Sequence, residues 1–343
     1  MLIDEILANL EAHMAEKLLP EEAYNQYLSG ALSKKHLSPL AETISRISGR
    51  YVEKRSSQMT LMSKEEEAKA YALYYLSINA AKVLHLIRNI IPELTNSAIN
   101  ILDYGAGPGT ASLAATFSNC VLSSIDIVEP SPAMRNVAKI LTSSFSKELP
   151  TNITAELTNS SSKRYEAIFL TNVLNELDHE SRLALIYKLK DRLASNGKIL
   201  IIEPALKFAT QELMLLRDQI FEKIEGLYPL FPCPHSHPCQ MRATEPDNWC
   251  HTQISWEAPP LVKQIDEATG FNKHRIKFAS LVLTDHENLV GGSRVVEDPI
   301  KRKYGYDVKI CSAELYGIVQ INKKRATEWE KKLSAAEQFD LVS

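Results

Sequence analysis

The chain has 343 residues, which is enough for one large domain or two ordinary ones. Its hydrophobic share of 45% and charged share of 24% are those of an ordinary globular protein and exclude a fibrous or disordered chain. The net charge of −3 excludes a global polycation, so any contact with RNA must come from a local patch. No run approaches about 18 apolar residues, so we expect no membrane span.

The first 30 residues do not resemble a targeting segment. They lack the apolar core of a secretion signal, and they hold one basic residue, Lys17, against six acids: Asp4, Glu5, Glu11, Glu16, Glu21 and Glu22. Mitochondrial targeting peptides avoid acids. We therefore expect a cytoplasmic location, where the cysteines are thiols or metal ligands before they are disulfides.

The periodicity of apolar residues divides the chain. Residues 1–95 carry apolar side chains at helical spacing and predict an N-terminal helical region. Short apolar runs then alternate with helical patterns. The runs predict strands at 99–103, 120–129, 152–157, 166–171 and 198–203, and the helical patterns predict helices at 132–144 and 179–194. This alternation is typical of an α/β fold with a doubly wound parallel sheet.

The second half is less regular. We expect a helix at 206–226, an irregular Cys/His-rich insertion at 227–255, a helix at 257–269 and strands between 274 and 321. The predicted domains are therefore the helical region 1–95, an α/β domain 96–325 that contains the insertion, and a charged C-terminal helix or tail at 326–343.

A glycine-rich turn is the main functional signal. The segment Asp103-Tyr104-Gly105-Ala106-Gly107-Pro108-Gly109 follows a strand and opens a helix. Glycine lets the backbone turn sharply and approach a ligand, and the free N–H groups at the start of a helix can bind polar ligand atoms. Nucleotide-cofactor folds and plain tight turns both use such a segment, so alone it is a weak signal.

A second acid makes the signal more specific. Glu129, followed by Pro130, ends the next strand, where a carboxylate can accept both hydroxyls of a ribose. This geometry also serves NAD, but the G-x-G-x-G spacing and an acid before the glycines favour S-adenosylmethionine (SAM), whose ammonium and sulfonium Asp103 could balance. We therefore expect a Rossmann-like class I SAM-dependent methyltransferase fold, with a strand–turn–helix corner and incidental acids as the alternative.

The third clear strand is followed by further polar residues. Asn172, Asn175 and Glu176 should lie at the carboxyl ends of the strands, where ligands bind in this fold, and should face the edge of the cofactor or the substrate. Asn172 is a candidate cofactor-binding residue, and all three are candidates for the acceptor side. A polar helix start is the alternative. Glu203-Pro204 closes the last predicted parallel strand. No Asn/Asp-Pro-Pro-Tyr/Phe or Pro-Cys motif identifies the acceptor, so the cofactor could be bound without methyl transfer.

Four cysteines suggest a metal site. Cys233, Cys239 and Cys250 lie in the insertion among prolines and histidines, and Cys311 follows 61 positions after Cys250. A long irregular loop in a compact domain needs an organiser, and a metal is the simplest one. Thiolates suit zinc and an iron–sulfur cluster equally. The alternative is a surface loop with thiols beside a buried Cys311; Cys120 is interpreted as a core thiol.

Together these residues resemble a known family, the methyltransferase-like proteins associated with the small ribosomal subunit of bacteria and mitochondria. The resemblance covers residues 30–325 and is carried by the segments 102–110, 128–131, 173–177 and 202–204, the cysteine block, 293–296 and 309–311. It implies that SAM binds in the α/β core and that Cys233, Cys239, Cys250 and Cys311 hold a [4Fe–4S] cluster. The chain departs from the family where Ala205 replaces a glycine-containing turn.

The resemblance implies a role with small-subunit rRNA or proteins, as a methyltransferase or as a non-catalytic assembly factor. A small-molecule methyltransferase is a third possibility. Eleven basic residues between 271 and 325 could neutralise RNA phosphates: Lys273, Arg275, Lys277, Arg294, Lys301, Arg302, Lys303, Lys309, Lys323, Lys324 and Arg325. A second small basic cluster comprises Arg46, Arg50, Lys54 and Arg55. A solvated charged face is the alternative for each of these residues.

Overall fold

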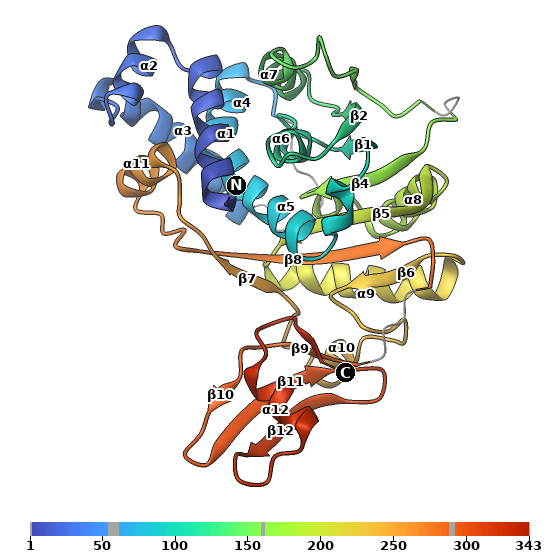
Figure 1. Ribbon diagram of the computed structural model, residues 1–343. Helices are drawn as coiled ribbons and strands as arrows, with labels where there is room; N and C mark the ends of the chain where they lie inside the picture. Colours follow the sequence, from blue (N-terminus) through green and yellow to red (C-terminus); the bar gives the residue numbers. More distant parts are fainter. Residues whose placement is uncertain (1, 54–61, 159–161, 288–291, 343) are drawn as a thin grey trace. The chain divides into compact units, whose positions relative to one another are not determined.

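The computed structural model describes residues 2–53, 62–158, 162–287 and 292–342 (Figure 1). Its contacts divide the chain into two compact units. The first unit comprises residues 1–177 and 253–276, and the second comprises residues 178–252 and 277–343. The boundaries predicted at residues 95 and 325 stay predictions, because this division follows contacts and not the sequence pattern.

The first unit begins with the predicted helices. They are α1 (Ile3–Leu18), α2 (Glu21–Leu28), α3 (Lys34–Glu53), α4 (Glu65–Tyr71), a π-helical turn η1 (Ala72–Leu76), α5 (Ser77–Asn89) and a 3₁₀ turn η2 (Pro92–Thr95). The helix α11 (Pro260–Thr269) returns to this unit and packs against α3 and η1. It ends at Gly270 in the left-handed conformation, as a helix of this length followed by glycine predicts.

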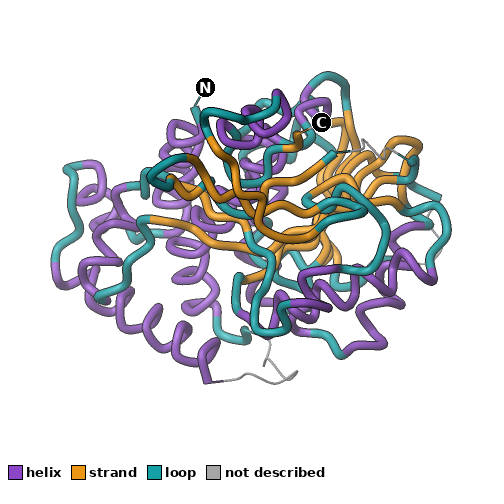
Figure 2. Tube along the Cα trace, turned by 90° about the horizontal axis from the view of Figure 1, so that it is seen from below, coloured by secondary structure: helices purple, strands orange, loops and turns teal. Residues whose placement is uncertain are grey.

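A parallel sheet forms the rest of the first unit. Its strands are β1 (Ile99–Tyr104), β2 (Leu122–Val128), β3 (Thr151–Thr154) and β4 (Tyr165–Thr171), in the order β3-β2-β1-β4. The helices α6 (Thr110–Phe117) and α7 (Pro132–Thr142) connect them and pack on the strands. The prediction of a parallel α/β sheet is confirmed, and the helices that flank the strands are visible in Figure 2.

The register of the sheet determines where its loops meet. Tyr104, the last residue of β1, pairs with Val128 on one side and with Leu170 on the other. The three strands therefore end at the same level, and the residues that follow them emerge at one edge of the sheet. This edge holds the glycine turn, Glu129 and Thr171.

The second unit contains an antiparallel arrangement. Its elements are α8 (His179–Lys190), β5 (Leu193–Pro204), α9 (Lys207–Lys223), β6 (Tyr228–Phe231), α10 (Gln240–Thr244) and most of β8 (Arg275–Thr284). The division passes through two strands, because residues 253–255 of β7 (Thr252–Ser255) and residues 275–276 of β8 fall in the range of the first unit. The strand β8 pairs antiparallel with β5 and with β6, and α8 and α9 pack on β5. The expectation that residues 227–255 are irregular is wrong in detail, because this segment contains β6, α10 and β7.

The C-terminal strands form a small antiparallel sheet. They are β9 (Ser293–Val295), β10 (Ile300–Lys301), β11 (Gly305–Cys311), β12 (Tyr316–Asn322) and β13 (Leu341–Val342), with α12 (Glu328–Ala335) packed against β11 and β13. Val295, Val308, Ile310, Ile321 and Leu333 make a buried apolar core for this sheet. The predicted strands and the C-terminal helix are confirmed.

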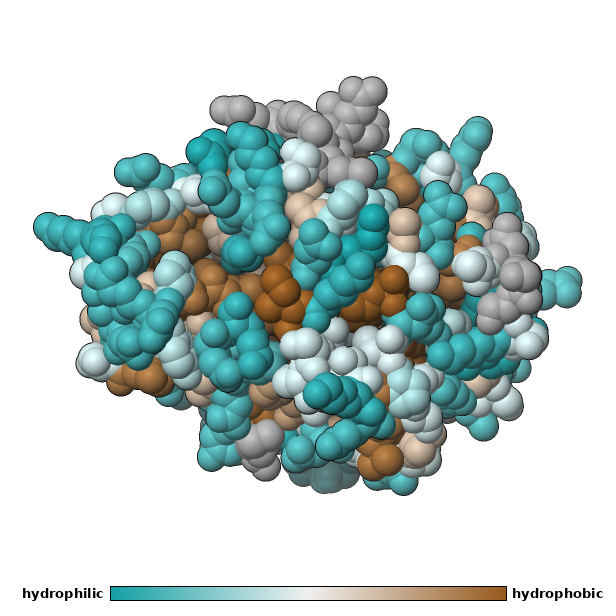
Figure 3. All heavy atoms as spheres, turned by 90° about the horizontal axis from the view of Figure 1, so that it is seen from above, coloured by the Kyte–Doolittle hydropathy of each residue, from teal (hydrophilic) through white to brown (hydrophobic). Residues whose placement is uncertain are grey.

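The surface is mostly polar. In Figure 3, which shows one face, hydrophilic side chains predominate and apolar side chains are seen between them. Within the part of the chain that the structure describes, no helix has both the length and the apolar character needed to cross a membrane.

Candidate functional site

The glycine turn is fastened to the neighbouring strand. The backbone amides of Gly105 and Ala106 donate to the carbonyl of Val128 over 2.7 and 3.2 Å, which ties the turn to the end of β2. Gly105 has a φ of +65°, and a Cβ placed on it would lie 2.5 Å from a methyl group of Val173. A side chain at position 105 is therefore excluded by both backbone conformation and space.

Asp103 is fully buried at the end of β1. Its Oδ2 accepts hydrogen bonds from the backbone amide of Ser112 at 2.8 Å and from the Ser112 hydroxyl at 3.0 Å, which anchors the first turns of α6. Its Oδ1 has no hydrogen-bond partner among the described residues. Burial raises the pKa of this carboxyl to about 7, against the opposing effect of the two Ser112 hydrogen bonds and of the backbone amide of Ala111.

Glu129 reaches the glycine turn. Its Oε2 accepts from the backbone amide of Gly107 at 2.8 Å, and its Oε1 accepts from the amide of Ser131 at 2.8 Å. Arg135 donates to the carbonyls of Glu129 and Pro130, so the backbone that carries the acid is also held. Burial raises the pKa of Glu129, and the two amides lower it. Each carboxylate oxygen keeps a lone pair that a ligand hydroxyl could use.

The loop after β4 presents oxygen atoms without partners. Thr171 Oγ1, Asn172 Oδ1 and Asn175 Oδ1 are buried and have no hydrogen-bond partner among the described residues. Asn172 adopts a left-handed φ of +58°, which asparagine tolerates better than most residues. Buried polar atoms are normally hydrogen-bonded, so a set of orphans at one edge suggests that something absent from the protein supplies the donors.

Glu176 lies near Glu129. Burial raises the pKa of Glu176 to about 7, and the negative charge of Glu129 contributes to the same shift. The structure therefore brings together the carboxylates that the sequence assigned to the cofactor side and to the acceptor side. Both belong to the first unit.

The other predicted pocket residues have simpler surroundings. Tyr104 is half-buried, and its pKa is raised by burial and by the charge of Glu156. The carbonyl of Ala106 accepts from the amides of Gly109 and Thr110, which closes the turn onto α6. Glu203 belongs to the second unit, at the end of β5 opposite Ala279.

The predicted thiol ligands gather in the second unit. Cys239, Cys250 and Cys311 pack against the apolar side chains of Met214, Met241 and Val296. Cys233 influences each of these three thiols electrostatically, so it lies close to them. Burial raises the pKa of Cys239 to about 11 and that of Cys311 to about 12. The Cys311 sulfur is also 3.7 Å from Nε2 of His235.

The predicted metal-binding insertion is not confirmed. Within the described ranges, no group of three or more His, Cys, Asp or Glu side chains is arranged to hold a metal ion. The premise that residues 227–255 need a metal to be ordered was also wrong, because other contacts hold this segment in place. Besides its short helix and strands, it is held by hydrogen bonds from two arginines and to one aspartate.

Two buried arginines have a structural role that the sequence did not reveal: Arg217 was not singled out, and Arg294 was counted among the basic residues that could bind RNA. Arg217 of α9 donates to the carbonyls of His235 and His237 and pairs with Asp218. Arg294 of β9 donates to the carbonyl of Pro232 at 2.8 Å.

The carboxylate of Asp218 accepts from the backbone amide of Cys239 at 2.9 Å. Arg217 belongs to no recognisable motif. The only sign in the sequence that it is buried is its charge at a position of α9 where the helical pattern is apolar.

The basic residues fall into separate groups. Arg46 and Arg50 pair with the carboxylate of Glu67 at 3.4 and 2.8 Å, so they are not a free cluster. Lys54 and Arg55 lie outside the described residues. Of the eleven basic residues between 271 and 325, Arg294 and Lys309 are turned inward, and Lys309 pairs with Glu245 at 2.7 Å. The expected continuous basic stretch is therefore broken up by the fold.

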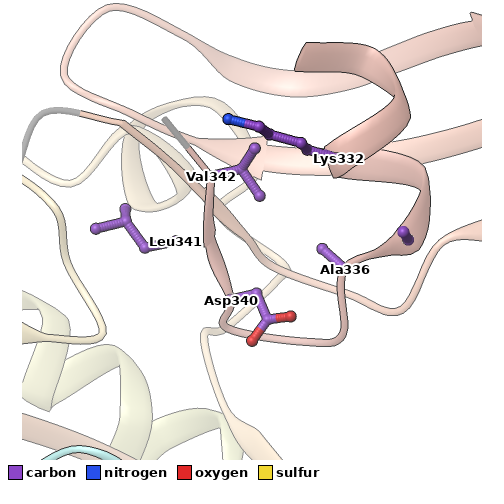
Figure 4. Close-up of a pocket in the computed structure, with 6 residues that line it drawn as sticks. Lys332, Ala336, Asp340, Leu341 and Val342 are labelled. Carbon is purple, nitrogen blue, oxygen red and sulfur yellow. The ribbon is translucent and has the colours of Figure 1, made fainter. Parts of the chain in front are cut away.

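An open hollow lies elsewhere. It is lined by Lys332, Ala335, Ala336, Asp340, Leu341 and Val342 at the C-terminal sheet (Figure 4). None of the predicted site residues lines it, and we do not assign it a function.

These features define a class of protein: an α/β protein with a carboxylate-flanked glycine turn at the carboxyl ends of its parallel strands. Residues 65–331 match the family described as mitochondrial small ribosomal subunit Rsm22. Since this is more than half of the chain, the chain belongs to the Rsm22 family. A comparison with curated proteins finds no match.

Several solved structures that resemble the chain are described as methyltransferases. Magnesium protoporphyrin IX methyltransferase from Synechocystis PCC 6803, with bound SAM, is 11% identical, with a TM-score of 0.40 over 75% of this chain and 99% of that one. The N-methyltransferase NodS from Bradyrhizobium japonicum, in complex with S-adenosylhomocysteine (SAH), is 11% identical, with a TM-score of 0.39 over 63% and 91%. A methyltransferase from Pyrococcus furiosus is 12% identical, with a TM-score of 0.39 over 71% and 100%. The α/β fold assigned above follows from strand order and register and does not depend on these similarities.

Proposed function

We propose that the chain binds SAM at the edge formed by the ends of β1, β2 and β4. The observation that carries the proposal is the set of buried, unpartnered oxygens at this edge: Asp103 Oδ1, Thr171 Oγ1, Asn172 Oδ1 and Asn175 Oδ1. The ammonium, amino and hydroxyl groups of SAM are donors, so the donor–acceptor balance fits this ligand. Glu129, already bonded to the glycine turn, would take the ribose hydroxyls.

A titration calorimetry experiment with SAM and SAH tests this. Asn175→Ala should weaken binding by about tenfold to a hundredfold, because one hydrogen bond to a buried acceptor is lost. The matched control is Asn152→Ala, which removes the same side chain from an exposed position on β3. The absence of heat for either ligand with the wild-type chain would remove the proposal.

Methyl transfer is the activity that such a site supports best. Bound SAM supplies an activated methyl group, and the protein's part is to hold it and the acceptor in line. Glu176 is the candidate for taking a proton from an acceptor, because its pKa of about 7 lies near neutral pH. Asn172 and Asn175 would line the acceptor side.

The partner is the small ribosomal subunit, as the description of the family suggests. The chain would act on its rRNA or proteins as a methyltransferase, or accompany it as a non-catalytic assembly factor. Radiolabelled methyl transfer to assembling small subunits separates the two. Binding of SAM without transfer favours the assembly factor, and transfer to small molecules without association with the subunit favours a metabolic enzyme. Because the family is described as mitochondrial, the expected cytoplasmic location stays a prediction.

We further propose that the second unit holds an iron–sulfur cluster. Cys233, Cys239, Cys250 and Cys311 would be its ligands, and the buried guanidinium groups of Arg217 and Arg294 would offset the charge of the thiolates. The thiolates of such a cluster bind different irons, so they need not converge on one point as the ligands of a single ion do. Their mutual electrostatic influence supports the grouping.

Anaerobic purification with metal analysis tests the cluster. The expected protein is brown, with iron and sulfide that Cys250→Ser loses and Cys120→Ser keeps. A colourless protein with one zinc would replace the cluster by zinc, and a metal-free, well-folded protein would reject both groups.

A further inference from the structure

The end of the β10–β11–β12 sheet collects positive charge from two separate parts of the chain. Lys301 ends β10, residues 302–304 form the turn between β10 and β11, and residues 323–325 follow β12. Together we call residues 301–304 and 323–325 the basic tip. The amide of Lys323 donates to the carbonyl of Tyr304 at 3.0 Å, so the two segments are fixed to each other. The amide of Arg302 donates to the carbonyl of Gly305 at 2.9 Å and closes the turn. The strands that carry the basic tip are labelled β10, β11 and β12 in Figure 1.

Most of this charge is not neutralised by the protein. Arg302 pairs with Asp307 at 2.7 Å. The remaining cations are exposed and form no ion pair within the ranges that the structure describes: Lys301, Lys303, Lys323, Lys324 and Arg325. The first acidic residues after this segment have other partners, because Glu328 pairs with Lys331 and Glu330 caps the start of α12. Like charges are held together here without an internal partner, which points to an external anion.

An exposed aromatic ring lies among these cations. Tyr304 is 67% exposed, although its backbone is fixed by the bond from Lys323. The ammonium of Lys303 lies 5.0 Å from the centre of this ring. By contrast, Tyr306, the other aromatic residue near the turn, packs against the apolar core of the sheet. Tyr304 is therefore an exposed ring on a fixed stretch of backbone rather than a core side chain.

We propose that the basic tip binds single-stranded RNA, with its lysines and Arg325 on consecutive phosphates and Tyr304 stacked on an unpaired base. Phosphates account for the charge, and an unpaired base accounts for the exposed ring, because a base inside a duplex is already stacked. This surface rests on the proposed association with the small ribosomal subunit, and it names RNA as the component that is contacted. It lies within the second unit, whereas the proposed SAM site belongs to the first.

The salt dependence of RNA binding tests the phosphate contacts. The full chain is titrated into a labelled oligouridine of about 16 nucleotides at several salt concentrations. Each phosphate contact contributes about −0.7 to the slope of log affinity against log salt for single strands, so Lys301→Ala/Lys303→Ala should reduce the slope by about 1.4. The control is Lys139→Ala/Lys147→Ala, which removes the same charge from exposed positions of the first unit. An unchanged slope in the Lys301/Lys303 variant would overturn the proposal.

The aromatic contact is tested separately. Tyr304→Ala should weaken oligouridine binding by roughly fivefold to a hundredfold at an unchanged salt slope, and Tyr304→Phe should keep the wild-type affinity, because stacking needs only the ring. Wild-type affinity of Tyr304→Ala, tighter binding of duplex RNA than of the single strand, or equal binding of polyglutamate would each count against the proposal.

Two parallel measurements separate this surface from the proposed function. If the wild type co-sediments with small subunits and the basic-tip variants bind oligouridine unchanged, the surface is wrong and the function stands. If the variants lose oligouridine but the wild type does not bind small subunits, the surface stands and the proposed partner is wrong.

Discussion

The carboxylate of Glu11 accepts hydrogen bonds from the backbone amides of Leu261 and Val262, 250 and 251 positions later in the chain, at 2.9 and 3.1 Å. These amides are at the start of α11, where backbone donors have no partner within the helix. Tyr27 donates a further bond to the same carboxylate at 3.3 Å. Glu11 on α1 thus caps a helix from a distant part of the sequence.

This contact predicts a pH dependence of stability. Burial raises the pKa of Glu11 from 4.5 to about 7, so the folded chain keeps a proton that the unfolded chain releases. The contribution of Glu11 to the free energy of unfolding is fully present below pH 4.5 and is lost as the pH rises through about 7. Glu11→Gln should therefore flatten the fall in stability between these values, measured by urea unfolding.

Comparison with the wild type isolates Glu11 from other groups. Burial also raises the pKa values of Asp103 and Glu176 to about 7, so they contribute to the same window in both proteins. Glu21→Gln, at an exposed position, is the control and should keep the wild-type slope. Parallel curves for wild type and Glu11→Gln would contradict the prediction.

The glycine turn allows a crossed test. Gly105→Ala would place a methyl group 2.5 Å from Val173 and should lower the free energy of unfolding, by roughly 2–4 kcal/mol for overpacking and left-handed strain together. Gly107→Ala meets no described atom within 4 Å and should cost only about 1 kcal/mol of backbone strain. Because Gly107 belongs to the turn assigned to SAM, affinity for SAM should fall more than stability. Equal losses of stability in the two variants would speak against the geometry of the turn.

A close backbone approach predicts a second effect. A Cβ on Gly305 would lie 1.6 Å from the carbonyl oxygen of Ile321, so Gly305→Ala must separate β11 from β12. We expect a loss of several kcal/mol of stability and a collapse of RNA binding by the basic tip. Gly49→Ala is the opposite control. Gly49 lies in α3, a Cβ there would meet no described atom outside the helix backbone within 4 Å, and the substitution should gain about 0.5–1 kcal/mol. Thermal unfolding of both variants checks the contrast.

Arg217 should matter more than its neighbour Arg242. Both pair with Asp218, but the Arg217 side chain is 3% exposed and also holds two carbonyls of the insertion. Arg217→Ala leaves buried acceptors unpaired and should cost about 3–5 kcal/mol, whereas Arg242→Ala, at a 44% exposed side chain, should cost less than about 1 kcal/mol. Limited proteolysis between residues 232 and 250 should be accelerated only by Arg217→Ala. Equal protection of the two variants would argue against Arg217 as the organiser.

The parts of the site that could be predicted are local in sequence. Strands end where apolar runs end, so Asp103, Glu129 and Asn172 could be placed at one edge from their positions alone. The π-helical turn Ala72–Leu76 could not be distinguished from ordinary helix, because one extra residue in a turn barely disturbs an apolar stripe.

The remaining features depend on distant partners. Nothing near Glu11 or Arg217 reveals the carbonyls and amides that they contact, and the pairing of Arg46 and Arg50 with Glu67 hides what the sequence presents as a free basic cluster. The insertion illustrates the same limit, since cysteines and histidines were visible in the sequence and the backbone hydrogen bonds that order it were not.

The return of α11 to the first unit has a consequence for synthesis. Because residues 253–276 complete that unit, a chain emerging from a ribosome must extend beyond Val262 before Glu11 meets its amides, and to about residue 276 before the unit is complete. By then, all of the intervening piece from 178 to 252 has already been made, and only the last stretch from 277 is still to come. Neither unit is a contiguous stretch of polypeptide, so a single cut of the gene at any of the three boundaries leaves at least one unit divided between the two fragments.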